Sequence, residues 1–397
     1  MIYNLHTNKQ KLRMDFLQKT REETQTWFTR NLKGDPWIWS ICIVMLLWSI
    51  VVVYSASVKD AYSQKDGNTE HYLYKHALLC FLSLLVMFFV HRIPYIKFVY
   101  VTRLAVWSSI LLLIFTMFFG TSVNDASRWI EIPVIGQRFQ PSEWAKVALI
   151  AHLSLILARH IKGGWNTREL FMEPLALVGL VCGLIFTSNV STAAMLAGIC
   201  FLLMYVGKVP LHYLLFTALG LVFFATLAIL LNSTSRSGTA QNRISAFFDK
   251  DVVVYQSQQS YMAMARGGIY GEGVSKSRQR RFLPEPQKDF IFAVAVEEYG
   301  TLGGTVLIVM YLILLYRGLR AIEATKRPFG GLLSAGLTFI VVSQAFSAMA
   351  VTVGLVPVTG QTLPFFSQGG TSLLFTGIAM GMILSVSRGE HMDEKRI

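Results

Sequence analysis

The chain has 397 residues, of which 53% are hydrophobic and only 15% are charged. A soluble domain carries about 25% charged residues, so this sequence lacks the charge for a solvated surface and indicates a membrane protein. The formal net charge of +13 does not indicate nucleic-acid binding, because most of the excess lies where membrane topology would place it. The four cysteines lie in apolar runs without metal-ligand spacing, which indicates small buried side chains.

Ten mainly apolar segments predict an all-α, polytopic integral membrane protein of about ten transmembrane helices. A basic cytoplasmic tail, 1–36, carries no small-residue cleavage site, so we expect the first helix to be retained. The membrane domain is expected over 37–388 and a short cytoplasmic tail over 389–397. The expected spans are 37–57, 73–90, 98–120, 143–159, 171–188, 192–207, 211–232, 290–316, 330–356 and 366–387.

Lysine and arginine are distributed unevenly between the two sides that these spans define. The N-terminal tail and the loops on its side hold most of them, and the short loops on the other side hold few. Because basic residues are retained in the cytoplasm, this asymmetry predicts that both termini lie inside, which requires an even number of spans.

The segment 233–289, between the seventh and eighth spans, is too long for a simple connection and too rich in Gly, Gln, Ser and Arg for a span. Loops of this length inside a compact domain are usually functional or disordered. We expect a large extracytoplasmic loop. Parts of it should lie back on the membrane domain, because 261–265 is largely apolar and 267–273 is rich in glycine.

Ionisable residues at membrane depth are costly, so each of them is a candidate for function. At the start of the fourth span, Glu143 and Lys146 are three residues apart and share one helix face. One interpretation is a self-neutralising pair at a helix start that begins with Pro141. We favour a buried pair that lines a polar cavity, because Lys146 lies about one turn inside the span.

The eighth span follows Asp289 directly and contains Glu297 and Glu298. The two glutamates are either functional or paired with a basic residue of another helix, for which Arg103 and Lys146 are candidates. Asp289 is either a helix N-cap, for which aspartate is a preferred residue, or a general base held at the outer membrane face. The sequence leaves both alternatives open.

The segment 357–372 joins the last two spans without a single charged residue. A tight turn would explain its prolines and glycines, but it would not explain so many hydroxyl and amide side chains together. Irregular backbone at membrane depth is tolerated where it is buried in protein or lines a cavity. This segment therefore predicts the wall of a polar cavity.

Several short motifs follow one another along the chain in a fixed order. They are Ser127-Arg128-Trp129-Ile130, Phe139-Gln140-Pro141-Ser142-Glu143 with Lys146, Gln259-Ser260 with Gly267-Gly268 and Gly271, Leu283-Pro284-Glu285, Asp289-Phe290-Ile291-Phe292-Ala293, Glu297-Glu298 with Gly300, Gly354-Leu355, Thr359-Gly360, Leu363-Pro364-Phe365, and Ser367 with Gly369-Gly370. With this set the chain resembles, over about 37–388, the SEDS family of FtsW- and RodA-type peptidoglycan polymerases. Each motif alone would be weak, but the ordered set is specific.

The resemblance implies a fold of ten spans with a large outer loop between the seventh and the eighth. It also implies a glycosyltransferase that polymerises lipid II, a disaccharide-pentapeptide on undecaprenyl pyrophosphate, into β-1,4-linked glycan strands at the outer face of the cytoplasmic (inner) membrane. The implied partners are lipid II, a class B penicillin-binding protein transpeptidase, other divisome proteins and membrane lipid. No nucleic acid is expected.

The resemblance implies that Asp289 is the catalytic residue. In the expected mechanism it is the general base for the attacking sugar hydroxyl. Alternatively, it holds a divalent cation, magnesium or manganese, that bridges the pyrophosphate. Arg128 and Lys146 are expected to bind the pyrophosphate, and Glu143 to orient Lys146. No organic cofactor is expected, and further substrate contacts are assigned to Gln140, Lys288, Glu298 and Ser367.

Some positions depart from the family pattern, although Asp289 and the Glu143–Lys146 pair are present. We therefore expect a divergent but active member. The departures are Gln287-Lys288 for His-Thr, Asn189 for an acidic residue, Lys75-His76 for Arg-Gln, and Ala348 for Asn.

The basic tail and the entry 34–37 favour the division (FtsW) branch over the elongation (RodA) branch, so we expect synthesis at the division septum. Two other classes of function stay open. A lipid II flippase or transporter would fit intramembrane Glu and Lys equally well. A non-catalytic divisome scaffold fits less well, because it would have no need of acidic residues at membrane depth.

Overall fold

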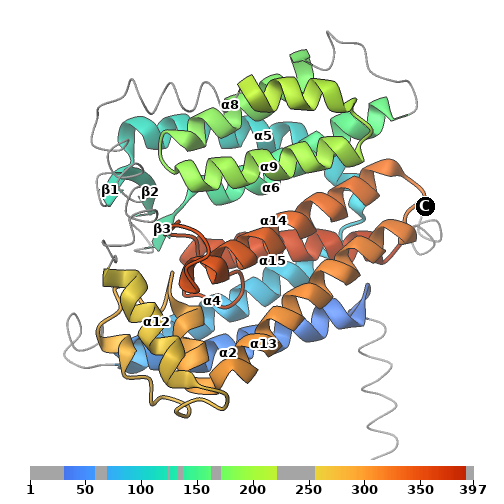
Figure 1. Cartoon of the computed structure of the whole chain (residues 1–397). Coiled ribbons are helices and arrows are strands. Elements are labelled where there is room, and N and C mark those ends of the chain that lie inside the picture. Colours follow the sequence, from blue (N-terminus) through green and yellow to red (C-terminus); the bar gives the residue numbers. More distant parts are fainter. Residues whose placement is uncertain are drawn as a thin grey trace, which may run out of the picture.

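Long apolar helices account for most of the chain in the computed structural model, which describes residues 31–58, 69–123, 126–132, 137–161, 171–220 and 255–389. Figure 1 shows α14 and α15 in the middle of the bundle, with α5, α6, α8 and α9 on one side and α2, α4 and α13 on the other. The bounds are α2 Pro36–Ala56, α4 Thr69–Val90, α5 Tyr95–Phe119, α6 Pro141–His160, α8 Ala176–Phe186, α9 Val190–Val206, α12 Tyr255–Gly267, α13 Ile291–Arg320, α14 Pro328–Thr352 and α15 Gly370–Ser387.

Within the described ranges, six helices are long and apolar enough to cross a membrane, namely α2, α4, α5, α13, α14 and α15. Three shorter apolar helices, Glu173–Phe186, Val190–Val206 and Leu211–Gly220, lie at the expected fifth to seventh spans. α6 occupies the expected fourth span, and charged residues near its start lower its hydropathy. Each expected span therefore coincides with a helix, although 221–232 of the seventh lies outside the described residues.

Two helix starts follow directly from their local sequence. The carboxylate of Asp35 accepts the N–H of Trp37 at 2.8 Å, and Pro36 occupies the first turn of α2, where its missing N–H costs nothing. The side-chain oxygen of Asn189 accepts the N–H of Thr192 at 3.2 Å and caps α9. Asn189, which stands where the family pattern has an acid, thus serves as a helix cap.

The outward faces of the outer helices are apolar. An aqueous solvent would oppose such continuous exposure, whereas lipid tails accommodate it. On the inward side, α14 contacts α6, α9, α13 and α15, and it is among the most buried of the long helices. Together these faces describe a membrane protein whose core helix is α14. The most exposed apolar side chains of α4 and α5 are Tyr74, Leu78, Phe81, Phe89, Tyr100, Leu104, Leu111, Phe118 and Phe119.

α13 is not the single continuous span that the sequence predicted over 290–316. It breaks at Gly300, whose φ of 72° and ψ of −176° are not helical. Beyond the break, Gly304 packs against the side chains of Val296 and Phe292. In a continuous helix these residues would be separated by about 12 and 18 Å of rise. The two halves therefore fold back on each other, with 291–299 buried inside the bundle and 301–320 forming the long outer half.

The expected outer loop, as far as it is described, lies back on the membrane domain as predicted. α12 packs against α13 and α14, and the chain after it runs along the break in α13. Glu272 and Gly273 donate their N–H groups to the carbonyls of Glu297 and Glu298 at 2.9 and 3.1 Å. Gly271, at φ 86°, permits this approach, because a Cβ there would meet the Glu298 carbonyl at 2.2 Å. The remainder of the loop, 233–254, lies outside the described residues.

A small antiparallel sheet connects α5 to α6, which the sequence analysis did not predict. It has the order β1-β2-β3, with β1 Thr121–Val123, β2 Ala126–Ile132 and β3 Gln137–Phe139. β2 lies against α5 and α6, so the sheet is held at the end of the bundle where α6 begins. It adds a β element to an otherwise helical chain.

Substitution of Gly300 by alanine should destabilise the protein. A Cβ at this position would meet the Ile269 carbonyl at 2.1 Å, and φ would stay positive. We expect a loss of at least about 1–3 kcal/mol in the free energy of unfolding, measured by denaturant titration in detergent micelles. Gly198→Ala in α9 is the matched control, because nothing lies within 4 Å of its added Cβ. Equal stability of the two variants would contradict the close approach at Gly300.

Candidate functional site

A buried ion pair lies near the start of α6. Lys146 Nζ is 2.8 Å from Glu143 Oε1, and the two side chains are only 5% and 10% exposed. The ammonium also donates to Gln344 Oε1 of α14 at 2.6 Å. Ser372 of α15 makes a long contact of 3.5 Å with the other oxygen of Glu143. The pair is thus buried, as favoured from the sequence, and it connects α6 with α14 and α15.

Gln344 connects the ion pair to the segment 357–369, which lies between α14 and α15. Gln344 donates its amide N–H to the carbonyl of Thr362 at 3.0 Å. The segment is largely buried, and Tyr311 of α13 donates its hydroxyl to the carbonyl of Pro364. Phe365 is fully buried at a φ of 59°, a conformation that a non-glycine residue adopts only when its surroundings enforce it. This segment, called the wall below, is therefore held in one conformation inside the bundle.

The other end of this wall holds the chain just before α13. Ser367 Oγ accepts the N–H of Leu363 at 2.8 Å and donates to the carbonyl of Lys288 at 2.7 Å. The N–H of Gln368 donates to the carbonyl of Gln287 at 2.8 Å. Two hydrogen bonds thus position the backbone immediately before Asp289, and the bond from Leu363 holds Ser367 in place for one of them. Ser367, assigned to substrate from the sequence, acts here on the backbone.

Asp289 is half-buried and lies beside the same wall. Its Oδ2 is 3.6 Å from the position that a Cβ on Gly360 would occupy, and Gly360 has a φ of 65°. The structure does not bear out the N-cap interpretation, because Phe290 is the N-cap residue of α13 and makes no side-chain cap bond.

Other residues assigned from the sequence lie apart from Asp289. The Lys288 ammonium turns to the surface and pairs with Glu285 at 2.7 Å, where both side chains are well exposed. Glu298 lies at the far end of the buried half of α13, where it accepts the hydroxyl of Ser55. The N–H of Gln140 donates to Thr371 Oγ1 at 3.3 Å, beside the ion pair. Arg128 lies in β2, and its side chain is outside the described residues.

The expected basic partners of Glu297 and Glu298 were wrong. The Glu297 carboxylate, fully buried, accepts the hydroxyl of Ser277 and the N–H groups of Arg278 and Gln279 at 2.9 and 3.2 Å. Backbone N–H groups and hydroxyls thus take the place of Arg103 or Lys146. Through these bonds and their backbone carbonyls, the two glutamates hold the loop after α12 on α13.

Sequence reasoning missed Gln361. Its side chain is 7% exposed, and neither its amide nitrogen nor its oxygen has a hydrogen-bond partner among the described residues. In the chain, Gln361 lies between Gly360 and Thr362. Gly360 is next to Asp289 in space, and the carbonyl of Thr362 accepts the amide N–H of Gln344. A buried amide without partners costs about 1–3 kcal/mol, so it needs an explanation. The sequence could have indicated this residue, because Gln361 is an amide side chain in an uncharged segment at membrane depth.

Residues 36–392 match the model of the family described as the cell cycle protein FtsW, RodA and SpoVE. Stage V sporulation protein E of Bacillus subtilis is 30% identical over 365 residues, which cover 91% of this chain and 98% of the relative. A protein of Geobacter metallireducens named "Probable peptidoglycan glycosyltransferase FtsW" is 32% identical over 372 residues, which cover 91% and 97% of the two chains.

Two solved structures have the same fold. One belongs to a study of how a peptidoglycan synthase complex coordinates polymerization and crosslinking. It has a TM-score of 0.71 and 24% identity, and the match covers 89% of this chain and 98% of that one. The other is the rod shape determining protein RodA of Thermus thermophilus, with a TM-score of 0.64, 24% identity, and coverage of 89% and 97%.

Replacement of Lys146 by methionine should strongly destabilise the protein, because it leaves the Glu143 carboxylate buried beside an apolar side chain. We expect a loss of about 3–5 kcal/mol in the free energy of unfolding, measured by denaturant titration in micelles. The double variant Glu143→Leu/Lys146→Met should recover most of this loss, because it leaves no buried charge. A double variant as unstable as the single one would show that the pair contributes through packing instead.

Proposed function

The chain belongs to the family of cell cycle proteins FtsW, RodA and SpoVE, and from this premise we propose that it is a peptidoglycan glycosyltransferase that polymerises lipid II. The named function of the FtsW relatives supports the reaction class. The observation that carries the assignment of the site is the wall 357–369. It holds Asp289 at one end and the Glu143–Lys146 pair at the other.

The chemistry of polymerisation requires one base and one means of stabilising negative charge. The 4-hydroxyl of one sugar attacks the anomeric carbon of the other substrate, and the bond from that carbon to the pyrophosphate breaks. The hydroxyl proton passes to the base, and the lipid pyrophosphate departs with the bonding electrons. Pyrophosphate is a good leaving group, so a general acid such as inverting glycosidases use is not needed.

Asp289 is the proposed base. The two hydrogen bonds from Ser367 and Gln368 fix the backbone just before it, which limits how far the carboxylate can move from a bound hydroxyl. Its partial burial keeps bulk water from surrounding it on all sides. These features suit a general base, which must accept a proton from a hydroxyl group held at a fixed position.

The pyrophosphate is proposed to lie toward α6 and β2. Lys146 is a buried cation whose charge is shared with Glu143 and Gln344, so it contributes a fixed positive potential and is not free to move. Arg128, in β2 just before α6, is the proposed direct contact to the phosphates. Glu143 then serves to orient Lys146.

A divalent cation, magnesium or manganese, would fit this site if the protein and the substrate both supplied ligands. Among the described residues, no group of three or more His, Cys, Asp or Glu could hold a metal ion. A cation would therefore be held by Asp289 together with oxygens of the substrate pyrophosphate, a common arrangement for magnesium. Such a cation would neutralise the departing charge.

Topology and partners follow the same proposal. Both termini lie in the cytoplasm, the loop 233–289 lies outside, and the enzyme works at the outer face of the membrane at the division septum. The partner is a class B penicillin-binding protein transpeptidase with other divisome proteins. A structural neighbour from a peptidoglycan synthase complex supports a partner of this kind.

Replacement of Asp289 by alanine or asparagine should abolish polymerisation, with a rate at least about 100-fold lower, because the proposed base is lost. The measurement is glycan strand formation from purified lipid II by the full chain in complex with its transpeptidase. Thermal unfolding and complex formation should stay unchanged. Strands made by the alanine variant at the wild-type rate would remove Asp289 from the mechanism. Lipid II translocation without strands, from wild type, would favour a flippase.

Replacement of Gln361 by leucine should reduce polymerisation without reducing stability. If its amide bonds the substrate, we expect a loss of roughly tenfold in kcat/KM, equivalent to about 1.4 kcal/mol. Gln344→Leu is the matched control, because Gln344 is bonded to Lys146 and Thr362 and its loss should lower the thermal unfolding temperature. A Gln361→Leu variant that is unstable but fully active would show a structural role instead.

A further inference from the structure

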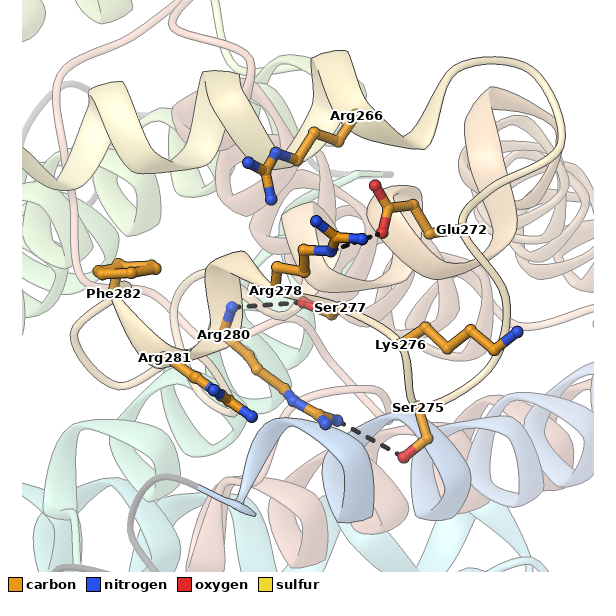
Figure 2. Close-up of a pocket in the computed structure, with 9 residues that line it drawn as sticks. All are labelled: Arg266, Glu272, Ser275, Lys276, Ser277, Arg278, Arg280, Arg281 and Phe282. Carbon is orange, nitrogen blue, oxygen red and sulfur yellow. Dashed lines mark hydrogen bonds and ion pairs between the residues drawn. The ribbon is translucent and has the colours of Figure 1, made fainter.

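A second candidate site lies on the outer loop, separate from Asp289. It is a cavity of about 800 Å³, here called the basic pocket, between the end of α12 and the loop that follows it. Figure 2 shows Arg266 reaching from α12 toward the arginines of that loop. The lining residues are Arg266, Glu272, Ser275, Lys276, Ser277, Arg278, Arg280, Arg281 and Phe282.

The charges of the basic pocket are not balanced. It has five Lys or Arg side chains and a single carboxylate, Glu272, which pairs with Arg278 at 3.5 Å. Among the described residues, Arg266, Lys276 and Arg281 form no ion pair. In the part of the chain that the structure describes, the guanidinium of Arg280 bonds to Ser55 and Ser275, and its buried Nε has no partner there. Burial lowers the pKa of Arg280 and the charge of Arg281 adds to that, while the carboxylates of Glu298 and Glu297 beneath the pocket act in the opposite direction and offset part of its charge.

The frame under these cations is rigid. Glu297 holds the N–H groups of residues 278 and 279, and the backbone of 272 and 273 bonds to α13. The backbone that carries the cations is therefore held in place, although the side chains of Arg266, Lys276, Arg278 and Arg281 are exposed. A multiply charged anion would neutralise several of these cations at once.

The residue types and the position indicate the class of anion. Four of the cations are arginine, whose planar fork matches phosphate oxygens in a bidentate manner. Ser55 lies at the end of α2, so the pocket is at the depth where a span ends and lipid headgroups begin. Phe282, about half exposed, gives the lining an apolar side. These features fit a phosphate on a membrane lipid better than a free phosphate in solution.

We propose that the basic pocket binds the phosphate or pyrophosphate headgroup of a membrane lipid. The site is distinct from the catalytic one, because the buried half of α13, about 13 Å long, separates Glu297 and Glu298 beneath the pocket from Asp289. It holds the lipid at the protein surface by its headgroup, with the tail in the surrounding bilayer. Two sources share this chemistry, an anionic phospholipid of the bilayer and a polyprenyl pyrophosphate.

The test is lipid binding to the full chain in detergent, followed by native mass spectrometry. Phosphatidylglycerol and undecaprenyl pyrophosphate are titrated separately, with phosphatidylcholine as the zwitterionic comparison. Wild type should bind one molecule of at least one anionic probe, more tightly than phosphatidylcholine. Arg266→Gln/Arg281→Gln should weaken that binding at least tenfold. Lys326→Gln/Arg327→Gln is the control, because it removes the same charge at the opposite end of α14, and it should bind as wild type does.

The pattern of loss identifies the source. Loss of phosphatidylglycerol binding assigns a bilayer phospholipid, and loss confined to undecaprenyl pyrophosphate assigns a carrier lipid. Inorganic pyrophosphate added to wild type should displace the bound lipid, which tests the pocket without any variant. Binding by the Arg266→Gln/Arg281→Gln variant equal to wild type, or no binding of either anionic probe to wild type, would overturn the proposal. A failure of the glycan assay would leave this binding result unaffected.

Discussion

The ion pair between Glu143 and Lys146 is the interaction on which the arrangement of the site depends. Two opposite charges inside a bundle at membrane depth are stable only when they are paired and every remaining hydrogen-bonding atom has a partner. Lys146 therefore requires Gln344, and Gln344 in turn requires the carbonyl of Thr362. Each of these requirements comes from a different helix or segment, so satisfying one charge fixes α6, α14 and the wall 357–369 relative to one another.

The same rule explains why irregular backbone can exist in the middle of this protein. The wall has no regular backbone ladder, yet its carbonyls and N–H groups accept or donate to Tyr311, Ser367 and Gln344. The wall also bonds to the carbonyls of Lys288 and Gln287. An internal segment of irregular backbone therefore requires polar side chains as hydrogen-bond partners, which explains why this uncharged segment has so many. That wall positions a carboxylate without placing further charge beside it.

Much of this could be predicted from the sequence, because hydropathy and charge asymmetry are properties of single segments. The helices, the buried pair and the importance of 357–369 all follow from such local patterns. The fold-back at Gly300 could not, because 290–316 was predicted as one span and the break is visible only in the backbone angles of Gly300 and in the contact of Gly304 with Phe292. The partners of Glu297 were missed for a similar reason. Sequence reasoning sought an opposite charge, whereas backbone N–H groups of a loop satisfied it.

The fold-back of α13 has a mechanical consequence. Its buried half is one rigid rod, with Asp289 at its start and Glu297 and Glu298, which hold the outer loop, near its end. A helix resists compression along its axis, so the two ends keep a fixed separation. A displacement of the outer loop along that axis must carry the carboxylate with it or break the hydrogen bonds at Ser367. The loop after α12 and Asp289 are thus mechanically coupled through one short helix, which the wall holds at its start.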